Sequence, residues 1–139
     1  MYSFKKAPPT IPSFIWKDKD AQILCDQRGY DIQALKLAHK HNCFGFCEFN
    51  KIPSWIITDP SKRSAQVRRL DGLFYFDKAK ALTLKGSDCS YPIGLSEIAE
   101  KPNVCITEGG TDFLAAWHFA YIHDCADEVA ILSMLGATQ

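Results

Sequence analysis

The sequence lacks a long hydrophobic run and also lacks an apolar segment near its start. Its 139 residues contain no stretch of 18 apolar residues, the length typical of a membrane-spanning helix. Residues 1–13 carry two lysines and three prolines, without the apolar centre that a secretory signal has. We therefore expect a cytoplasmic protein with no membrane partner.

The chain also lacks an excess of charge of either sign. Lysine and arginine number 16, and aspartate and glutamate also number 16. A nucleic-acid-binding surface, which needs positive charge, must then be local rather than global. The length is that of one domain, which buries roughly 68% of the surface of its unfolded chain. The apolar content of 47% is enough for such a core.

Cysteine is not scarce, because six cysteines are spread along the chain. An even number is compatible with disulfides, but without an export signal we expect all six to be reduced. A zinc site is the other alternative, because His39, His41, Cys43 and Cys47 fall within nine residues. On a strand, residues 43 and 47 would lie about 13 Å apart, too far to share one ion. We favour histidines at a helix C-terminus over zinc.

Hydrophobic periodicity predicts an α+β fold. Asp18 or Asp20 can cap a helix that runs to about residue 27, and Asp31 can cap a second helix over 32–39. Gly29 between them favours an N-terminal helical hairpin. Short apolar runs separated by tight turns then predict an antiparallel sheet, with strands at 44–49, 55–58, 65–70 and 82–84.

The pattern changes after Pro102. An apolar strand at 104–107, a helix at 112–121 and a strand at 128–134 form a strand–helix–strand unit, which requires a parallel sheet. We expect three segments: a flexible arm rich in proline and lysine over 1–15, a subdomain of helices and antiparallel strands over 16–101, and the α/β unit over 102–139.

The strongest candidate functional site in the sequence directly follows the strand at 104–107. Glu108 lies at the carboxyl end of this strand, where ligands bind in open α/β sheets, and is a candidate general acid, general base or metal ligand. Gly109 and Gly110 would let a phosphate approach a helix N-terminus. Alternatively, the glycines only form a turn, and Asp112 only offsets the helix dipole.

These motifs resemble the TOPRIM domain of bacterial and phage DNA primases, which topoisomerases and some nucleases share. Glu108-Gly109-x-x-Asp112 after an apolar strand resembles its first motif, and residues 129–137 are similar to its next strand. The upstream half of the chain also follows the order of the primase core. Its matching segments are Arg28-Gly29-Tyr30, residues 65–69 and residues 80–83. The resemblance covers residues 20–139 and implies a partial TOPRIM-like α/β unit.

The resemblance implies template-directed nucleotide addition, with single-stranded DNA or RNA and nucleotides as partners. Glu108 would be the catalytic residue, and Arg68, Arg69 and Lys80 would bind phosphates together with Gly109 and Gly110. Alternatively, these three basic residues only lie on a solvent-exposed face of the sheet. Magnesium is the implied cofactor, with Glu108 as a partial ligand and Asp112 as a weaker candidate.

The chain departs from the family in one important respect. TOPRIM domains hold Mg²⁺ with an Asp-x-Asp motif on the strand after the Leu-Gly segment, and this sequence stops before that strand. Asp124 and Asp127 precede the strand at 128–134 and cannot replace the motif. A single Glu108 is a poor magnesium site, because Mg²⁺ prefers six oxygen ligands and usually relies on one or two carboxylates plus phosphates. We therefore expect no primer synthesis by this chain alone.

Three interpretations remain open. The chain is a fragment of a primase-type nucleotidyltransferase, or a truncated phage or mobile-element relative that binds nucleic acid or a replication or defence protein without catalysis, or an unrelated α+β binding domain. In the first two, the strand at 128–134 becomes a bare sheet edge, and bare edges invite pairing. We therefore expect that edge to form a homodimer or to be covered by the N-terminal arm.

Overall fold

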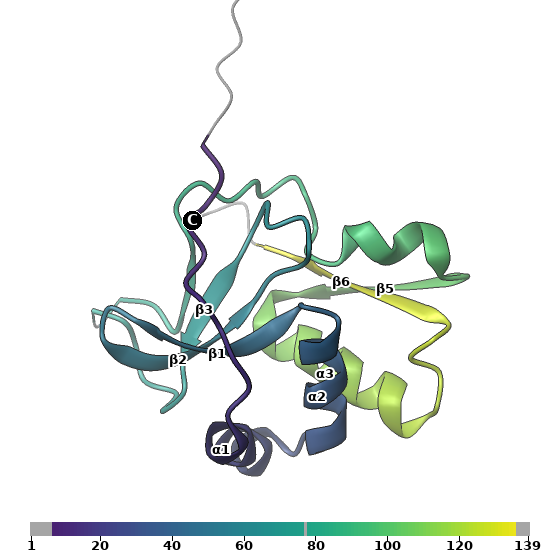
Figure 1. The fold of residues 1–139 in the computed structure, drawn as a ribbon, viewed down its shortest axis with the longest axis horizontal. Coiled ribbons are helices and arrows are strands. Elements are labelled where there is room, and N and C mark those ends of the chain that lie inside the picture. Colours follow the sequence, from purple (N-terminus) through teal and green to yellow (C-terminus); the bar gives the residue numbers. More distant parts are fainter. Residues whose placement is uncertain (1–6, 77, 136–139) are drawn as a thin grey trace, which may run out of the picture.

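The computed structural model describes residues 7–76 and 78–135 and is a mixed α+β fold, as the sequence predicts (Figure 1). A four-stranded antiparallel sheet has the order β1-β2-β3-β4, and a separate two-stranded sheet pairs β5 with β6 in parallel. Two predicted features extend beyond the described residues. They are residues 1–6 of the arm, and Gly136 and Ala137 at the end of the segment that is similar to the next TOPRIM strand.

The two N-terminal helices are α1 (Asp18–Arg28) and α2 (Ile32–Lys40). Gly29 ends α1 in the left-handed conformation with φ 75°, which glycine adopts at little cost. Asp31 caps α2 by accepting a hydrogen bond from the Gln33 N–H, as expected. The helix predicted to end near residue 27 is thus present, but its predicted N-cap was wrong, because Lys17 is the N-cap and makes no side-chain cap.

The antiparallel sheet consists of β1 (Phe44–Phe49), β2 (Ile52–Ile57), β3 (Gln66–Arg69) and β4 (Ala81–Thr83). The expected turn after β1 is shorter than its sequence suggests. Asn50 and Lys51 both have positive φ, and Phe49 pairs with Ile52, as in a two-residue hairpin. Strand β2 therefore begins three residues earlier than the predicted residue 55.

The C-terminal unit contains β5 (Asn103–Glu108), α3 (Gly109–Ile122) and β6 (Val129–Met134), and a short helix η1 (Leu95–Glu100) precedes it. The expected glycine turn is absent from this described segment, because Glu108 is the N-cap and α3 begins at Gly109. In Figure 1, η1 and α3 lie on opposite faces of the β5–β6 pair.

Both faces of the antiparallel sheet are covered. One face carries Phe44, Phe46, Trp55 and Ile57, which form a core with the three α-helices. The opposite face carries Cys47, Ile56 and Val67, and packs with Tyr75, Leu84 and the partly buried Phe14. The sheet therefore separates two hydrophobic clusters, which fixes the side to which each residue of β3 points.

The described part of the N-terminal arm, residues 7–15, runs across the sheet (Figure 1). Ile15 exchanges backbone hydrogen bonds with Phe46 of 2.8 and 2.9 Å. A Cβ atom on Gly45 would lie 2.3 Å from the ring of Phe14, so only glycine fits beneath that ring. Residues 7–15 of the arm therefore cover the edge of β1 and not the edge of β6, where the sequence predicted either the arm or a second copy.

The outer edge of β6 is covered by the loop before η1. Ser133 exchanges hydrogen bonds of 2.9 Å with Ile93 in both directions. Gly94 follows with φ 91°, and a Cβ atom there would lie 2.1 Å from the Ile131 carbonyl oxygen. The bare edge that the sequence predicted at residues 128–134 is thus partly covered, and β5 instead has no partner on its other edge among the described residues.

Asp59 connects this covering loop to the antiparallel sheet. Its carboxylate is 1% exposed and accepts hydrogen bonds from the Gly94 N–H at 2.7 Å and the Ser61 N–H at 2.9 Å, as well as from the Ser61 hydroxyl. A buried carboxylate is stable only when hydrogen bonds of this kind replace its hydration. Asp59 therefore stabilises the loop that covers β6.

No helix in the described ranges is long and apolar enough to cross a membrane. All six cysteines lie within those ranges and are free. Burial raises the pKa of the Cys47 thiol to about 11.

We predict that Asp59→Ala lowers the free energy of unfolding by about 3 kcal/mol, because the charged acceptor is lost and a buried N–H at Gly94 is left without a partner. Urea denaturation followed by circular dichroism measures the change. Asp127→Ala is the matched control, since Asp127 is exposed. Equal stability of the Asp59→Ala and Asp127→Ala variants would show that the Asp59 contacts do not stabilise the fold.

Candidate functional site

Strand β3 presents its side chains alternately to the two sides of the sheet. Gln66 and Arg68 point to the side of the helices, and Arg68 lies opposite Trp55 of β2. Val67 belongs to the cluster on the other side. The two adjacent arginines of β3 therefore face in opposite directions and have different roles.

A small pocket brings together the three basic residues that the sequence singled out. It lies between the C-terminal end of α1, strands β2 and β3, and the segment after β3. Its lining residues are Leu24, Gln27, Arg28, Trp55, Arg68, Arg69, Gly72 and Lys80. Arg28 is a fourth basic residue at this pocket, and our prediction of the site did not include it.

Like charges meet at the pocket. Burial lowers the pKa of Arg68, and the positive charge of Arg28 lowers it further. Tyr30 and Asp112 act in the opposite direction. A guanidinium remains protonated under all ordinary conditions, so this shift reflects the cost of burying the Arg68 charge and, after it, repulsion by Arg28, and not a loss of charge. An anion bound between Arg28 and Arg68 would relieve that repulsion.

Tyr30 connects the pocket to the start of α3. Its hydroxyl donates a hydrogen bond of 2.7 Å to the Thr111 carbonyl oxygen. Burial raises the pKa of Tyr30 to about 12, against the opposing effects of Arg28 and Arg68. The neutral hydroxyl is therefore the form that joins α3 to the end of α1 at neutral pH.

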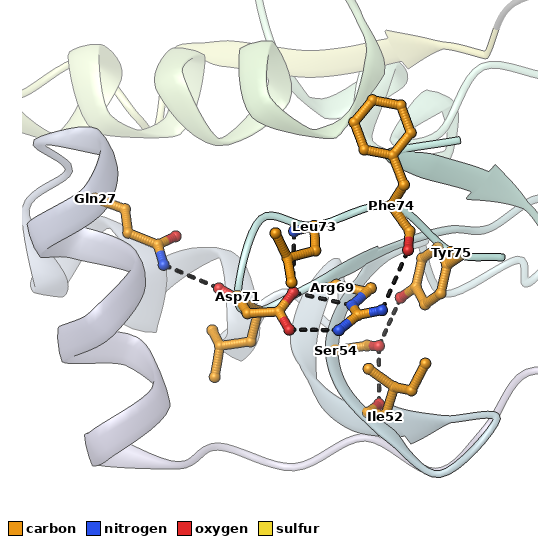
Figure 2. Close-up of polar contacts among 9 residues, drawn as sticks. Gln27, Ile52, Ser54, Arg69, Asp71, Leu73, Phe74 and Tyr75 are labelled. Atoms are coloured by element: carbon orange, nitrogen blue, oxygen red, sulfur yellow. Dashed lines mark hydrogen bonds and ion pairs between the residues drawn. The ribbon is translucent and has the colours of Figure 1, made fainter. Parts of the chain in front are cut away.

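Arg69 is a structural residue of the turn that follows β3, as Figure 2 shows. Its guanidinium donates to both carboxylate oxygens of Asp71, at 2.9 and 2.6 Å, and to the Phe74 carbonyl oxygen at 3.1 Å. Asp71 also accepts a hydrogen bond from the Leu73 N–H. The hydrogen bond from Arg69 lowers the pKa of the Asp71 carboxyl.

The turn that Arg69 holds also reaches Lys80. The ammonium of Lys80 lies 5.5 Å from the centre of the Phe74 ring, within the range of a cation–π contact. Arg69 fixes the Phe74 backbone, so it positions the surroundings of Lys80. Arg69 can therefore influence the pocket without itself contacting a ligand.

Backbone conformation and packing explain why both positions at the start of α3 are glycine. Gly109 has φ 76°, which side chains other than glycine rarely adopt. A Cβ atom on Gly110 would lie 2.9 Å from the Trp55 ring. The Gly110 N–H already donates to Gln66 Oε1 at 2.9 Å. A phosphate-binding role for these glycines stays a prediction, and at Gly110 it would require displacing Gln66.

The two predicted carboxylates lie near this helix start and are both exposed. Glu108 pairs with Met134 at the carboxyl ends of the parallel strands, the position that the sequence indicated. The negative charge of Asp112 raises the pKa of both Tyr30 and Arg68. Asp112 is therefore electrostatically coupled to the basic pocket.

No cluster of three or more histidine, cysteine, aspartate or glutamate residues that could hold a metal ion is found within residues 7–76 and 78–135. His39 Nδ1 lies 2.8 Å from the Phe44 carbonyl oxygen, and His41 Nδ1 lies 2.5 Å from Glu97 Oε1. These two histidines thus have protein partners at the end of α2. Glu108 and Asp112 are therefore not part of such a cluster in the described part of the chain.

Sequence reasoning missed Arg28 and Gln66 as parts of the site. Arg28 is the last residue of α1 before Gly29, and the helix stop signal at Gly29 could have marked it as a residue at a helix end. Gln66 gave no such signal, because its contact with Gly110 joins residues far apart in the chain. Only the packing of α3 against β3 reveals its role.

We predict that Arg69→Ala lowers the free energy of unfolding by about 1–3 kcal/mol, because the turn loses its charge-assisted hydrogen bonds. Arg63→Ala is the control, since Arg63 stacks on Tyr91 at 4.7 Å and lies away from this turn. Urea denaturation compares the two variants. If Arg69→Ala is no less stable than Arg63→Ala, the turn does not need Arg69.

Alkaline pH provides a test of the Tyr30 contact. Tyrosine ionises near pH 10 in the unfolded chain but near 12 at Tyr30 in the folded chain. The folded state therefore holds more protons in this window, and stability falls as the pH rises from about 10 through about 12. We predict that Tyr30→Phe removes about 1 kcal/mol of this decline, a value reduced for the partial exposure of Tyr30.

Urea denaturation at a series of pH values measures the decline for Tyr30→Phe and for the control Tyr121→Phe, whose ring is partly exposed. Part of the decline remains in both variants, because burial also raises the pKa of Tyr75 to about 12. The same pH dependence in the wild type and in Tyr30→Phe would contradict the prediction.

Comparison with known proteins finds no matching family model, no matching curated protein and no matching solved structure. The role of the pocket is therefore inferred from the residues and geometry of this chain.

Proposed function

We propose that this chain binds single-stranded nucleic acid through its phosphates at the pocket of Arg28, Arg68 and Lys80, as a primase-like relative of TOPRIM proteins. One observation carries the proposal. Basic residues from α1, from β3 and from the segment before β4 line the same pocket, although the whole chain has no net charge.

Phosphate is the anion that this arrangement fits best. A guanidinium offers two parallel N–H donors that match two phosphate oxygens. Arg28 and Arg68 repel each other, so one phosphate between them gains from both charges. Lys80 adds a third positive charge at the same pocket. A carboxylate ligand would offer less charge to the same group of cations.

An exposed aromatic side chain beside the pocket favours a single-stranded ligand. Phe74 is 45% exposed, and its ring already contacts the ammonium of Lys80, which lines the pocket. Unpaired bases stack on such rings, while cations bind the adjacent phosphates. A basic pocket with an exposed ring beside it therefore suits single-stranded DNA or RNA better than a duplex.

The proposal concerns binding and not catalysis by this chain. Nucleotidyl transfer needs Mg²⁺ to neutralise charge on the reacting phosphates. In a complete TOPRIM site, Glu108 would act as a metal ligand or assist proton transfer. No cluster of three or more potential metal ligands exists among the described residues, and we assign no catalytic step to Glu108 or Asp112.

We predict that Arg68→Ala weakens binding of a fluorescent single-stranded oligonucleotide about 10–100-fold at low salt. It should also reduce the slope of log affinity against log salt by about 1, because one phosphate contact is lost. Fluorescence anisotropy at several salt concentrations measures both quantities. Arg68 is half-buried beside a like charge, so its removal should leave the fold intact, which circular dichroism checks.

The matched control is Arg63→Ala, which removes the same charge from a residue that stacks on Tyr91 away from the pocket. We expect Arg28→Ala to behave like Arg68→Ala, and Arg63→Ala to bind within about twofold of the wild type, since a distant charge contributes little. No binding at low salt, or equal losses for Arg68→Ala and Arg63→Ala, would contradict the proposed site.

A further inference from the structure

Strand β5 has a free edge. It pairs with β6 on one side, and no described segment pairs with it on the other. The outer edge of β6, by contrast, is occupied by Ile93. The two-stranded sheet therefore has one covered edge and one open edge (Figure 1).

The hydrogen bonds establish which backbone groups of β5 face outward. The Asn103 N–H donates to the Glu128 carbonyl oxygen at 3.0 Å, so the backbone groups of Asn103 point toward β6. Successive residues of a strand point their N–H and C=O groups to opposite sides. Those of Val104 and Ile106 then face outward, as does the N–H of Glu108.

The open edge is apolar and unprotected. Ile106 is 67% exposed and Val104 is 44% exposed. Proteins usually protect an edge strand with lysine, proline or a bulge, but the residues from Val104 to Thr107 include no charge and no proline. Such an edge favours pairing with another strand.

We infer that this edge pairs with the same edge of a second copy of the chain, in antiparallel orientation and with a two-fold axis at Ile106. The N–H and C=O groups of Ile106 then bond to those of the second copy. Val104 lies opposite Glu108 of the other chain, so the outward groups of both copies find partners. The two short sheets become one sheet of the order β6-β5-β5-β6. This inference does not depend on the proposed function.

Charge supports a second copy in this register. The only charged residue of β5 is Glu108, at one end of the strand. Like charges directly opposite each other destabilise a sheet, and an axis at Ile106 places the two Glu108 side chains at opposite ends of the pair. The exposed Val104 and Ile106 side chains of both copies then lie on one face, where they cover each other.

The opposite face of β5 also favours association. A groove of about 430 Å³ lies between β5 and α3, and its lining includes Cys105, Thr107 and the exposed Phe119. In the proposed register Cys105 lies opposite Thr107 of the second copy, so the groove continues across the two-fold axis. Phe119 stands at the position where α3 of the second copy would approach.

We predict that the wild-type chain is a dimer at about 100 µM and dissociates on dilution below the micromolar range, as expected for a small interface of roughly micromolar affinity. Ile106→Lys should be a monomer, because it places two positive charges opposite each other at the axis. Ile23→Lys is the matched control, since Ile23 is 43% exposed on α1. Size-exclusion chromatography with light scattering measures the mass of each.

A second variant tests the register. Thr107→Cys would place a new thiol opposite Cys105 of the second copy, in a pair without backbone hydrogen bonds whose Cα atoms are about 4.5 Å apart, within the range of a disulfide. We expect a covalent dimer on non-reducing gels after mild oxidation. The double variant Cys105→Ser/Thr107→Cys, which keeps the other cysteines, should not form it.

A monomeric wild type, or a dimer that Ile106→Lys leaves intact, overturns the inference. Equal cross-linking of Thr107→Cys and of the double variant overturns the register.

Discussion

The packing of the start of α3 against the antiparallel sheet holds the molecule together. The two sheets share no strand pairing among the described residues, so helix packing must join them. Gly110 lies against the Trp55 ring and donates its N–H to Gln66. These contacts place the end of β5, which carries Glu108, beside the strand that carries Arg68. The spatial relation between the carboxylates and the basic pocket thus depends on these contacts and on the Tyr30–Thr111 hydrogen bond, while the Asp59–Gly94 hydrogen bond also links the two sheets.

The basic pocket brings positive charges close together, although positive and negative residues are equal in number over the whole chain. Arg28 and Arg68 repel each other, and Arg68 is also partly desolvated. Shifted pKa values of this kind are enriched at functional sites, and structural ion pairs also produce them. Arg69, its neighbour in the chain, is instead satisfied by Asp71 and the Phe74 carbonyl. In the proposed function Arg68 therefore binds the ligand, whereas Arg69 supports the turn.

The open edge of β5 is a consequence of a sheet with only two strands. A parallel pair usually lies within a larger sheet with both faces covered. Here η1 and α3 lie on opposite faces (Figure 1), while Val104 and Ile106 of β5 remain exposed. The Ile93 loop covers part of the β6 edge through Ser133, and Asp59 links that loop to the rest of the chain through Gly94. The other edge, that of β5, has no partner among the described residues.

The sequence by itself determined the elements whose signals are local. Gly29 and Asp31 placed the break between α1 and α2, and apolar runs placed β1, β5 and β6. The strand–helix–strand order also required β5 and β6 to be parallel, because a helix between two strands returns the chain to the same end of the sheet. The basic residues Arg68, Arg69 and Lys80 were candidates only through the resemblance of the sequence to the primase core.

Tertiary structure decided what depends on contacts between distant residues. It directed Arg68 toward Arg28 and Arg69 toward Asp71, because alternate residues of a strand face opposite sides. It also began α3 at Gly109, where Trp55 leaves room only for glycine at the next position. The covered edge is that of β6 and the open edge is that of β5. No local pattern could decide this, because Ile93, which pairs with Ser133, is far from it in the chain.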